Sequence, residues 1–353
     1  MRRSPSWWPA RLAPHLVFLI PELIMAAGPF VIETVGSAAG RAKYRMPDFF
    51  YGGQALIEGV MMRGRTTVAM SVRPPSGEIR TMSEPLPHAL TSGRWVKVPF
   101  ARGVFVLYET LVLGTRMLMR SAAIAAEGED IQIGKGTMVA TMIFSLGFAV
   151  VLFFLLPLFL STFAESAVES DLLANLVEGL IRLVIFIAYI GLIGLMEDIR
   201  RVFAYHGAEH KAISANEAQR PLTPEEVDRF STAHTRCGTT FILIVVVISI
   251  FFFSLIPRAG VPLPLLFLSR IVLVPVIAAV AYELVRFGAS HYGNRVVRAV
   301  YAPGLWLQSL TTRPPDRSML EVSIASLESC LAADREAAGG APAGTQPAPT
   351  PTA

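Results

Sequence analysis

Residues 139–163 read VATMIFSLGFAVVLFFLLPLFLSTF and contain no charged side chain. A helix needs about 20 apolar residues to cross the roughly 30 Å hydrocarbon core of a bilayer. This run is long enough to do so, and it therefore predicts a membrane protein. The composition agrees, because 53% of the 353 residues are hydrophobic and only 16% are charged, whereas an average soluble domain carries about 25% charged residues.

Three more apolar runs predict further spans. Residues 241–256 are almost purely apolar, residues 265–285 carry two charges, and residues 172–196 contain Glu178 and Arg182. Because residues four apart share a helical face, Glu178 and Arg182 can pair with each other or reach the membrane interface. The fold class that we expect is an α-helical polytopic membrane protein with about four transmembrane helices and a small mixed α/β cytoplasmic portion.

The placement of Lys and Arg predicts which segments face the cytoplasm. Residues 164–177 contain no Lys or Arg, whereas residues 197–238 and 286–353 contain several each. Because positive side chains are retained on the cytoplasmic side, we expect these two basic segments and both termini in the cytoplasm. The net charge of +4 is too small to indicate nucleic-acid binding, so membrane lipid is the expected partner.

The spans divide the chain into five expected regions. These are an N-terminal extension (1–45), a cytoplasmic region with a β-hairpin and an amphipathic helix (46–136), a four-span membrane domain with cytoplasmic loop 197–238 (137–288), a cytoplasmic segment with a helix (289–333) and a disordered tail (334–353).

Local patterns support these regions. In the second region, residues 68–73 and 78–82 flank a Pro-Pro-Ser-Gly turn and predict the hairpin, and residues 104–119 predict the amphipathic helix. In the fourth region, Asp316 can cap the predicted helix. Residues 12–32 are apolar but interrupted by prolines and charges, so a fifth span there stays open.

Residues whose side chains can bind a metal or take part in a reaction concentrate in the predicted loop, which holds three of the six histidines and one of the two cysteines. The first element, YHGAEHK, places His206 and His210 four residues apart with Glu209 beside them. The second element, HTRCGTT, supplies His234 and Cys237. Imidazole nitrogens and a thiolate are the ligands that zinc prefers in proteins, and two histidines four apart on a helix can share one ion.

The order His-x-x-Glu-His also matches an inverted zinc-protease pattern, in which the Glu acts as general base toward a water on the metal. The sequence therefore predicts a divalent metal site with Glu209 as the catalytic base. Zinc is the expected ion because of the thiolate, while iron and manganese stay open.

Two other interpretations remain. The histidines can form a metal-free polar network, and the cysteine can be a small packed apolar side chain. Glu209 can pair with Lys211, Arg200 or Arg201 instead of acting as a base. If all four ligands bind the ion, the site is closed and structural, whereas three ligands leave a position for water.

Two further motifs have weaker signals. Residues 51–64 read YGGQALIEGVMMRG but lack the spacing of a phosphate-binding or dinucleotide-binding loop. Within them, Glu58 and Arg63 can form a buried ion pair or belong to the site. Residues 307–316, LQSLTTRPPD, follow the last predicted span; we expect a juxtamembrane connector there rather than a lipid-phosphate site.

Four motifs in order, GGQALIEGVMMRG, YHGAEHK, HTRCGTTF and LQSLTTRPPD, resemble the YqhQ-like family of bacterial membrane proteins over about residues 51–331. This family has no known function, and its members are often labelled predicted metal-dependent enzymes. The resemblance implies a location in the bacterial inner membrane. It also implies a centre made of the same five residues: His206, Glu209, His210, His234 and Cys237.

The hypothesis from the sequence is a zinc-dependent hydrolase at the cytoplasmic face of the inner membrane, acting on a peptide or a lipid-linked substrate. The alternative is a non-enzymatic membrane scaffold or transport component, in which the same ligands form a structural metal site.

Overall fold

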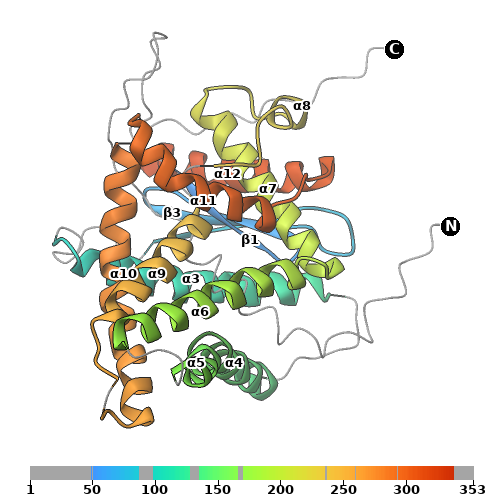
Figure 1. Cartoon of the computed structure of the whole chain (residues 1–353). Helices are drawn as coiled ribbons and strands as arrows, with labels where there is room; N and C mark the ends of the chain where they lie inside the picture. The colour runs from blue at the N-terminus through green and yellow to red at the C-terminus, as the bar shows by residue number, and fades with distance from the viewer. Residues whose placement is uncertain are drawn as a thin grey trace, which may run out of the picture.

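The computed structural model describes residues 49, 51–86, 98–127, 135–165, 170–234, 237–258, 260–291 and 293–337. Among these residues the protein is mostly helical, with one small antiparallel sheet (Figure 1). The possible span at 12–32 lies outside the described residues. So does the expected disordered tail, except that residues 334–337 belong to the last helix.

The sheet has four strands in the order β1-β2-β3-β4. Their bounds are Gly52–Leu56, Gly59–Arg63, Thr67–Val72 and Arg80–Pro85, and each strand is antiparallel to its neighbour. The β3–β4 pair confirms the expected hairpin, although its second strand begins at Arg80 rather than at residue 78 and continues to Pro85. The β1–β2 hairpin, formed by residues 52–63, is not predicted by the sequence.

Helices cover both faces of this sheet. α7 (Glu197–Glu217) and α12 (Arg317–Ala337) pack on one face, and α3 (Ala101–Ala125) packs on the other. Because side chains alternate along a strand, Met62 faces α7 and α12 while its neighbour Met61 faces α3. The sheet is thus the middle layer of a three-layer unit.

The ion pairs of the first hairpin differ from our expectation. Glu58 and Arg63 do not pair with each other, because Glu58 lies in the β1–β2 turn and Arg63 lies at the far end of β2. Glu58 instead binds Arg201 of α7, with Oε2 and Nη2 2.6 Å apart, and Arg63 binds Glu109 of α3 at 3.0 Å. Each pair ties the sheet to one covering helix.

The predicted cap of the C-terminal helix is confirmed. The side chain of Asp316 accepts a hydrogen bond from the backbone N–H of Met319 at 2.9 Å, which satisfies one of the unpaired donors at the start of α12.

Three described segments are long and apolar enough to cross a membrane: Ala140–Phe163, Asp171–Ile193 and Leu263–Gly288. The first comprises most of α4 (Lys135–Val150), the π-helix η4 (Val151–Leu155) and most of α5 (Leu156–Glu165), while the others form α6 (Asp171–Ile193) and most of α10 (Leu263–Ser290). The fourth expected span falls largely in α9 (Gly238–Ser254), which is apolar but has only 17 residues.

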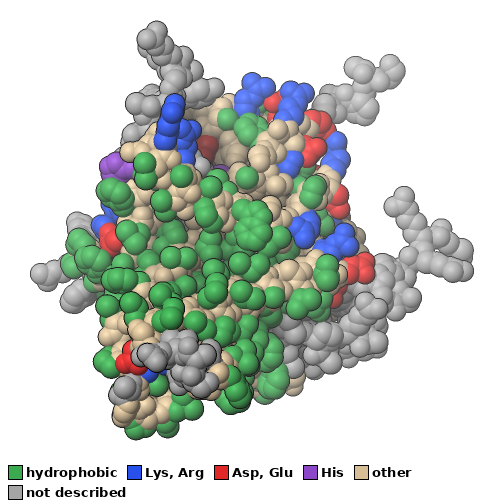
Figure 2. Space-filling view, in the orientation of Figure 1, with side chains coloured by type: hydrophobic (Ala, Val, Ile, Leu, Met, Phe, Trp, Pro, Cys, Tyr) green, Lys and Arg blue, Asp and Glu red, His purple; other side chains and the backbone are tan. Residues whose placement is uncertain are grey.

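Apolar and charged surfaces lie at different ends of the molecule. Figure 2 shows hydrophobic side chains covering the lower part of one face, where Figure 1 places α4, α5, α6 and α10. Charged side chains gather at the upper end and along one side, near α12 and the short helix α8 (Pro224–Val227). A protein with one half in a membrane and the other half in water requires such a separation of apolar from charged surface.

A buried ion network joins the membrane-type helices. The expected pair between Glu178 and Arg182 is present, and Glu178 also binds Arg258 at 3.2 Å and Arg270 at 2.8 Å. Glu178 is 1% exposed and Arg270 is 0% exposed. Because a buried charge without a partner is very costly, this carboxylate holds α6, α10 and the α9–α10 connection together.

We predict that Glu178→Gln destabilises the protein by about 3–5 kcal/mol, because the substitution leaves buried guanidinium groups without their shared carboxylate. Thermal unfolding in detergent measures the effect. Glu225→Gln is the matched control, since Glu225 forms an exposed pair with Arg317, and the same substitution there should leave the midpoint unchanged. Equal midpoints for the two variants would contradict this account.

Candidate metal centre

The two histidines of the first element lie on a buried helix, as their spacing predicts. Residues 197–217 of the segment expected as a cytoplasmic loop form α7, which packs against β1 and α12. Glu197 and Asp198 occupy its first turn, where negative charge interacts favourably with the helix dipole. The helix carries His206, Glu209 and His210 into the interior, where each is 5% exposed or less.

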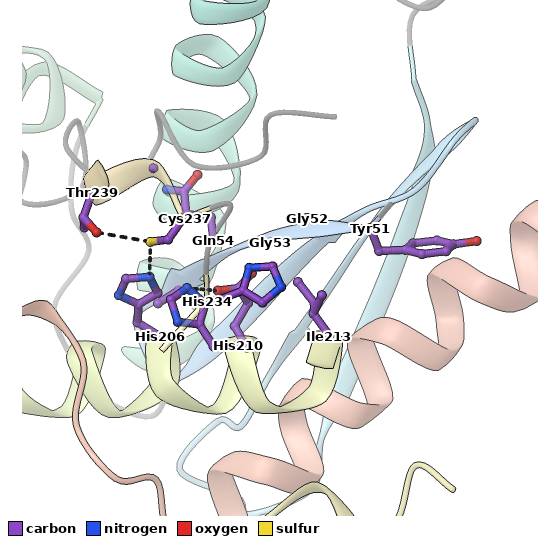
Figure 3. A pocket seen from close by; sticks show the side chains of 13 residues that line it. Tyr51, Gly52, Gly53, Gln54, His206, His210, Ile213, His234, Cys237 and Thr239 are labelled. Atoms are coloured by element: carbon purple, nitrogen blue, oxygen red, sulfur yellow. Dashed lines mark hydrogen bonds and ion pairs between the residues drawn. The ribbon is translucent and has the colours of Figure 1, made fainter. Parts of the chain in front are cut away.

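Three potential ligands converge at one point. The Nε2 atom of His206 lies 3.1 Å from the Sγ atom of Cys237, and the rings of His206 and His210 have centroids 4.3 Å apart. One ligand atom from each of these three residues lies within 4.8 Å of the other two. Figure 3 shows the imidazole rings beside the sulfur. This group could hold a metal ion.

Backbone carbonyls orient both of these histidines. The Nδ1 atom of His206 lies 2.8 Å from the carbonyl oxygen of Thr311, and that of His210 lies 2.6 Å from the carbonyl oxygen of Thr232. Because a carbonyl only accepts hydrogen bonds, each Nδ1 carries the proton and each Nε2 keeps a lone pair. Metal-binding histidines are oriented in this way.

His234, the fourth expected ligand, lines the same pocket but is not in the group of three whose ligand atoms lie within 4.8 Å of one another. Its Nε2 atom lies 3.6 Å from the Oε2 atom of Glu217, and its ring centroid is 5.5 Å from that of His210. Gln308 fixes its backbone, accepting a hydrogen bond from the N–H of His234 at 2.7 Å and donating one to its C=O at 2.9 Å. The described residues thus bring together three of the four expected ligands.

Glu209 lies beside the three ligands. Its Oε2 atom is 3.5 Å from the Nε2 atom of His210, and its carboxylate accepts a hydrogen bond from the backbone N–H of Gly53 in β1. A Cβ atom at position 53 would lie 2.5 Å from Cγ of Glu209. Gly53 therefore leaves the space that the Glu209 side chain occupies.

Two of the cations that could have neutralised Glu209 pair elsewhere. Lys211 binds the carboxylate of Asp228 at 2.8 Å, and Arg201 binds Glu58. The interpretation of Glu209 as a simple surface ion-pair partner of either residue is therefore wrong.

Burial controls the protonation of the centre. It lowers the pKa of His206, His210 and His234, and it raises the pKa of Glu209. The imidazoles are therefore neutral at pH 7 and able to bind a metal. Burial also raises the pKa of Cys237 to about 11, whereas a coordinated thiol is deprotonated outright.

The pocket at this centre includes residues that the sequence did not single out. β1 forms one wall through Gly52, Gly53, Gln54 and Ala55, and the start of α9 forms another. Residue types cannot identify the carbonyls of Thr232 and Thr311, because every residue has one. The motif at residues 307–316, expected to be a connector, supplies Gln308 and Thr311. These two residues contact His234 and His206, so the motif is part of the centre.

Three helices that are long and apolar enough to cross a membrane suggest a membrane protein, and a buried His-His-Cys group that could hold a metal lies beside its small sheet. The family model described as "Protein of unknown function (DUF1385)" matches residues 98–333, and the chain belongs to this family. It is 32% identical over 303 residues to "Uncharacterized protein YqhQ" of Bacillus subtilis (strain 168). The aligned residues cover 82% of this chain and 94% of that protein. No solved structure matches the chain.

We predict that His206→Ala, His210→Ala and Cys237→Ser each reduce zinc from about one ion per chain to near zero, because each removes one of three converging ligands. His234→Ala is the matched control, and it should retain zinc. Elemental mass spectrometry on detergent-purified protein measures the content. Zinc loss in His234→Ala equal to that in His210→Ala would show that the site has four ligands.

We also predict that Gly53→Ala destabilises the protein by about 1–3 kcal/mol, because the new methyl group would collide with Glu209 and with the backbone oxygen of Met61, 2.8 Å away. Gly191→Ala in α6 is the control, since a Cβ atom there meets nothing within 4 Å. Thermal unfolding compares the two. An unchanged midpoint for Gly53→Ala would contradict the packing of Glu209 on β1.

Proposed function

We propose that this protein is a metal-dependent hydrolase, with zinc as its ion, whose site lies where the polar half of the molecule meets the membrane-type helices. The observation that carries the proposal is the group of three converging ligands with a buried carboxylate beside them. A zinc site with three protein ligands has a position for water, and catalytic zinc sites are built in this way.

The residues fit the expected chemistry. His206, His210 and Cys237 would hold a divalent ion, which would supply Lewis acidity for attack of water on a carbonyl group. Glu209, whose Oε2 atom lies 3.5 Å from the Nε2 atom of His210, would accept a proton from the attacking water, and its burial-raised pKa makes it a better base than an exposed carboxylate. The Nδ1 hydrogen bonds hold both imidazoles in the required tautomer.

The position of Cys237 supports a substrate that arrives from the membrane side. Cys237 is the N-cap residue of α9, which is apolar along its length. A peptide or lipid-linked substrate near the membrane surface can therefore reach the centre without crossing the polar half. We extend this to a bacterial inner-membrane location with both termini in the cytoplasm, which rests on the distribution of Lys and Arg.

We predict that Glu209→Gln keeps its zinc but lowers kcat/KM for p-nitrophenyl acetate by about 100-fold or more, because the amide cannot accept the proton from water. The assay uses zinc-loaded, detergent-purified protein and measures release of p-nitrophenol. Glu217→Gln is the control, since Glu217 faces His234 rather than the three ligands, and its rate should stay within about threefold of the unmodified protein.

The outcome that contradicts the proposal is equally specific. If Glu209→Gln hydrolyses the ester at the unmodified rate while the ligand variants unfold, the metal site is structural. The protein would then be a scaffold or transport component rather than a hydrolase.

A further inference from the structure

Gln54 is a buried side chain with no hydrogen-bond partner. It lies in β1 and is 2% exposed, and neither its Nε2 nor its Oε1 atom has a partner among the described residues. Among the described side chains, only Gln54 has two atoms in this condition. Each unsatisfied buried group costs about 1–3 kcal/mol, so an arrangement of this kind points to a ligand that supplies the missing partners.

The location of Gln54 fits such a role. It lines the same pocket as His206, His210 and Cys237. Figure 3 shows its side chain extending from β1 toward the Cys237 side of the pocket. Gly52, also in the wall of the pocket, adds no side chain that would keep a ligand backbone at a distance.

The chemistry of the carboxamide selects among ligands. Gln54 offers one donor group and one acceptor, so a complete match needs a ligand that offers both. A phosphate or an ester offers acceptors alone and would leave Oε1 unsatisfied. A peptide backbone offers an N–H and a C=O within one residue.

The protein itself contains another glutamine that pairs with the backbone of one residue in this way. The carboxamide of Gln308 binds both the N–H and the C=O of one residue, His234, at 2.7 and 2.9 Å. A glutamine carboxamide in this fold can therefore hold the backbone of a single residue through two hydrogen bonds.

We propose that Gln54 binds the backbone of a peptide substrate, taking the N–H and C=O of one residue near the scissile bond. The inference rests on the proposed hydrolase function, and it narrows the substrate from a peptide or lipid-linked molecule to a peptide. Gln54 orients the substrate, while Glu209 and the three ligands act on the scissile bond.

The test measures binding, so it does not depend on turnover. Acetohydroxamate and the hydroxamate of acetyl-dialanine both chelate zinc, but only the second offers peptide groups to Gln54. Calorimetry on zinc-loaded protein compares their affinities in the unmodified chain, in Gln54→Leu and in the control Gln219→Leu, which changes an exposed glutamine.

We expect the peptide hydroxamate to bind the unmodified protein and Gln219→Leu at least about tenfold more tightly than acetohydroxamate does. In Gln54→Leu this preference should disappear while acetohydroxamate binds as before. The unfolding midpoint of Gln54→Leu should not fall, because the replaced groups have no partners to lose.

Two results would overturn the assignment. A preserved preference in Gln54→Leu would show that Gln54 does not contact the peptide, and a lower unfolding midpoint would show that its role is structural. If acetohydroxamate does not bind the zinc-loaded unmodified protein, the proposed hydrolase function itself fails, and the role of Gln54 fails with it.

Discussion

The packing of α7 against the chain that follows α11 (Arg295–Thr311) is the constraint on which the centre depends. The backbone N–H of Arg313 donates to the carbonyl of Phe203 at 2.9 Å, and a Cβ atom at Gly207 would lie 2.2 Å from the carbonyl oxygen of Arg313. This close approach brings the Thr311 carbonyl to His206. A glycine in the middle of a helix costs stability, but here it allows a backbone contact that orients a ligand.

A buried glutamate lies at the centre of each half of the molecule, but the surroundings of the two carboxylates differ. In the apolar half, Glu178 gathers guanidinium groups and fixes the order of the helices. In the polar half, Glu209 is held by a backbone N–H and lies beside histidines that burial keeps neutral. The carboxylate of Glu178 is neutralised by cations, which suits a role in holding helices together. The carboxylate of Glu209 has a raised pKa, which suits a role in proton transfer.

The sequence predicts the grouping of three candidate ligands better than it predicts the architecture around them. The spacing of His206 and His210 and the single nearby Cys237 correctly indicated one convergent group, because helical geometry and ligand chemistry are both local. The β1–β2 hairpin escaped detection because its two-residue turn, Ile57-Glu58, lacks the usual Asn-Gly or Asp-Gly signal, although Glu58 adopts a φ of 52°. The orientation of His234 depends on Gln308, 74 residues away, and no local pattern contains that information.

X-ray absorption spectroscopy of the zinc-loaded protein tests the central claim most directly, because it counts the atoms around the ion. The account predicts one sulfur at about 2.3 Å, two imidazole nitrogens at about 2.0–2.1 Å and one further light atom from water. A spectrum with three imidazoles and one sulfur would instead describe a closed structural site. A spectrum without sulfur would contradict the participation of Cys237 and, with it, the three-ligand centre.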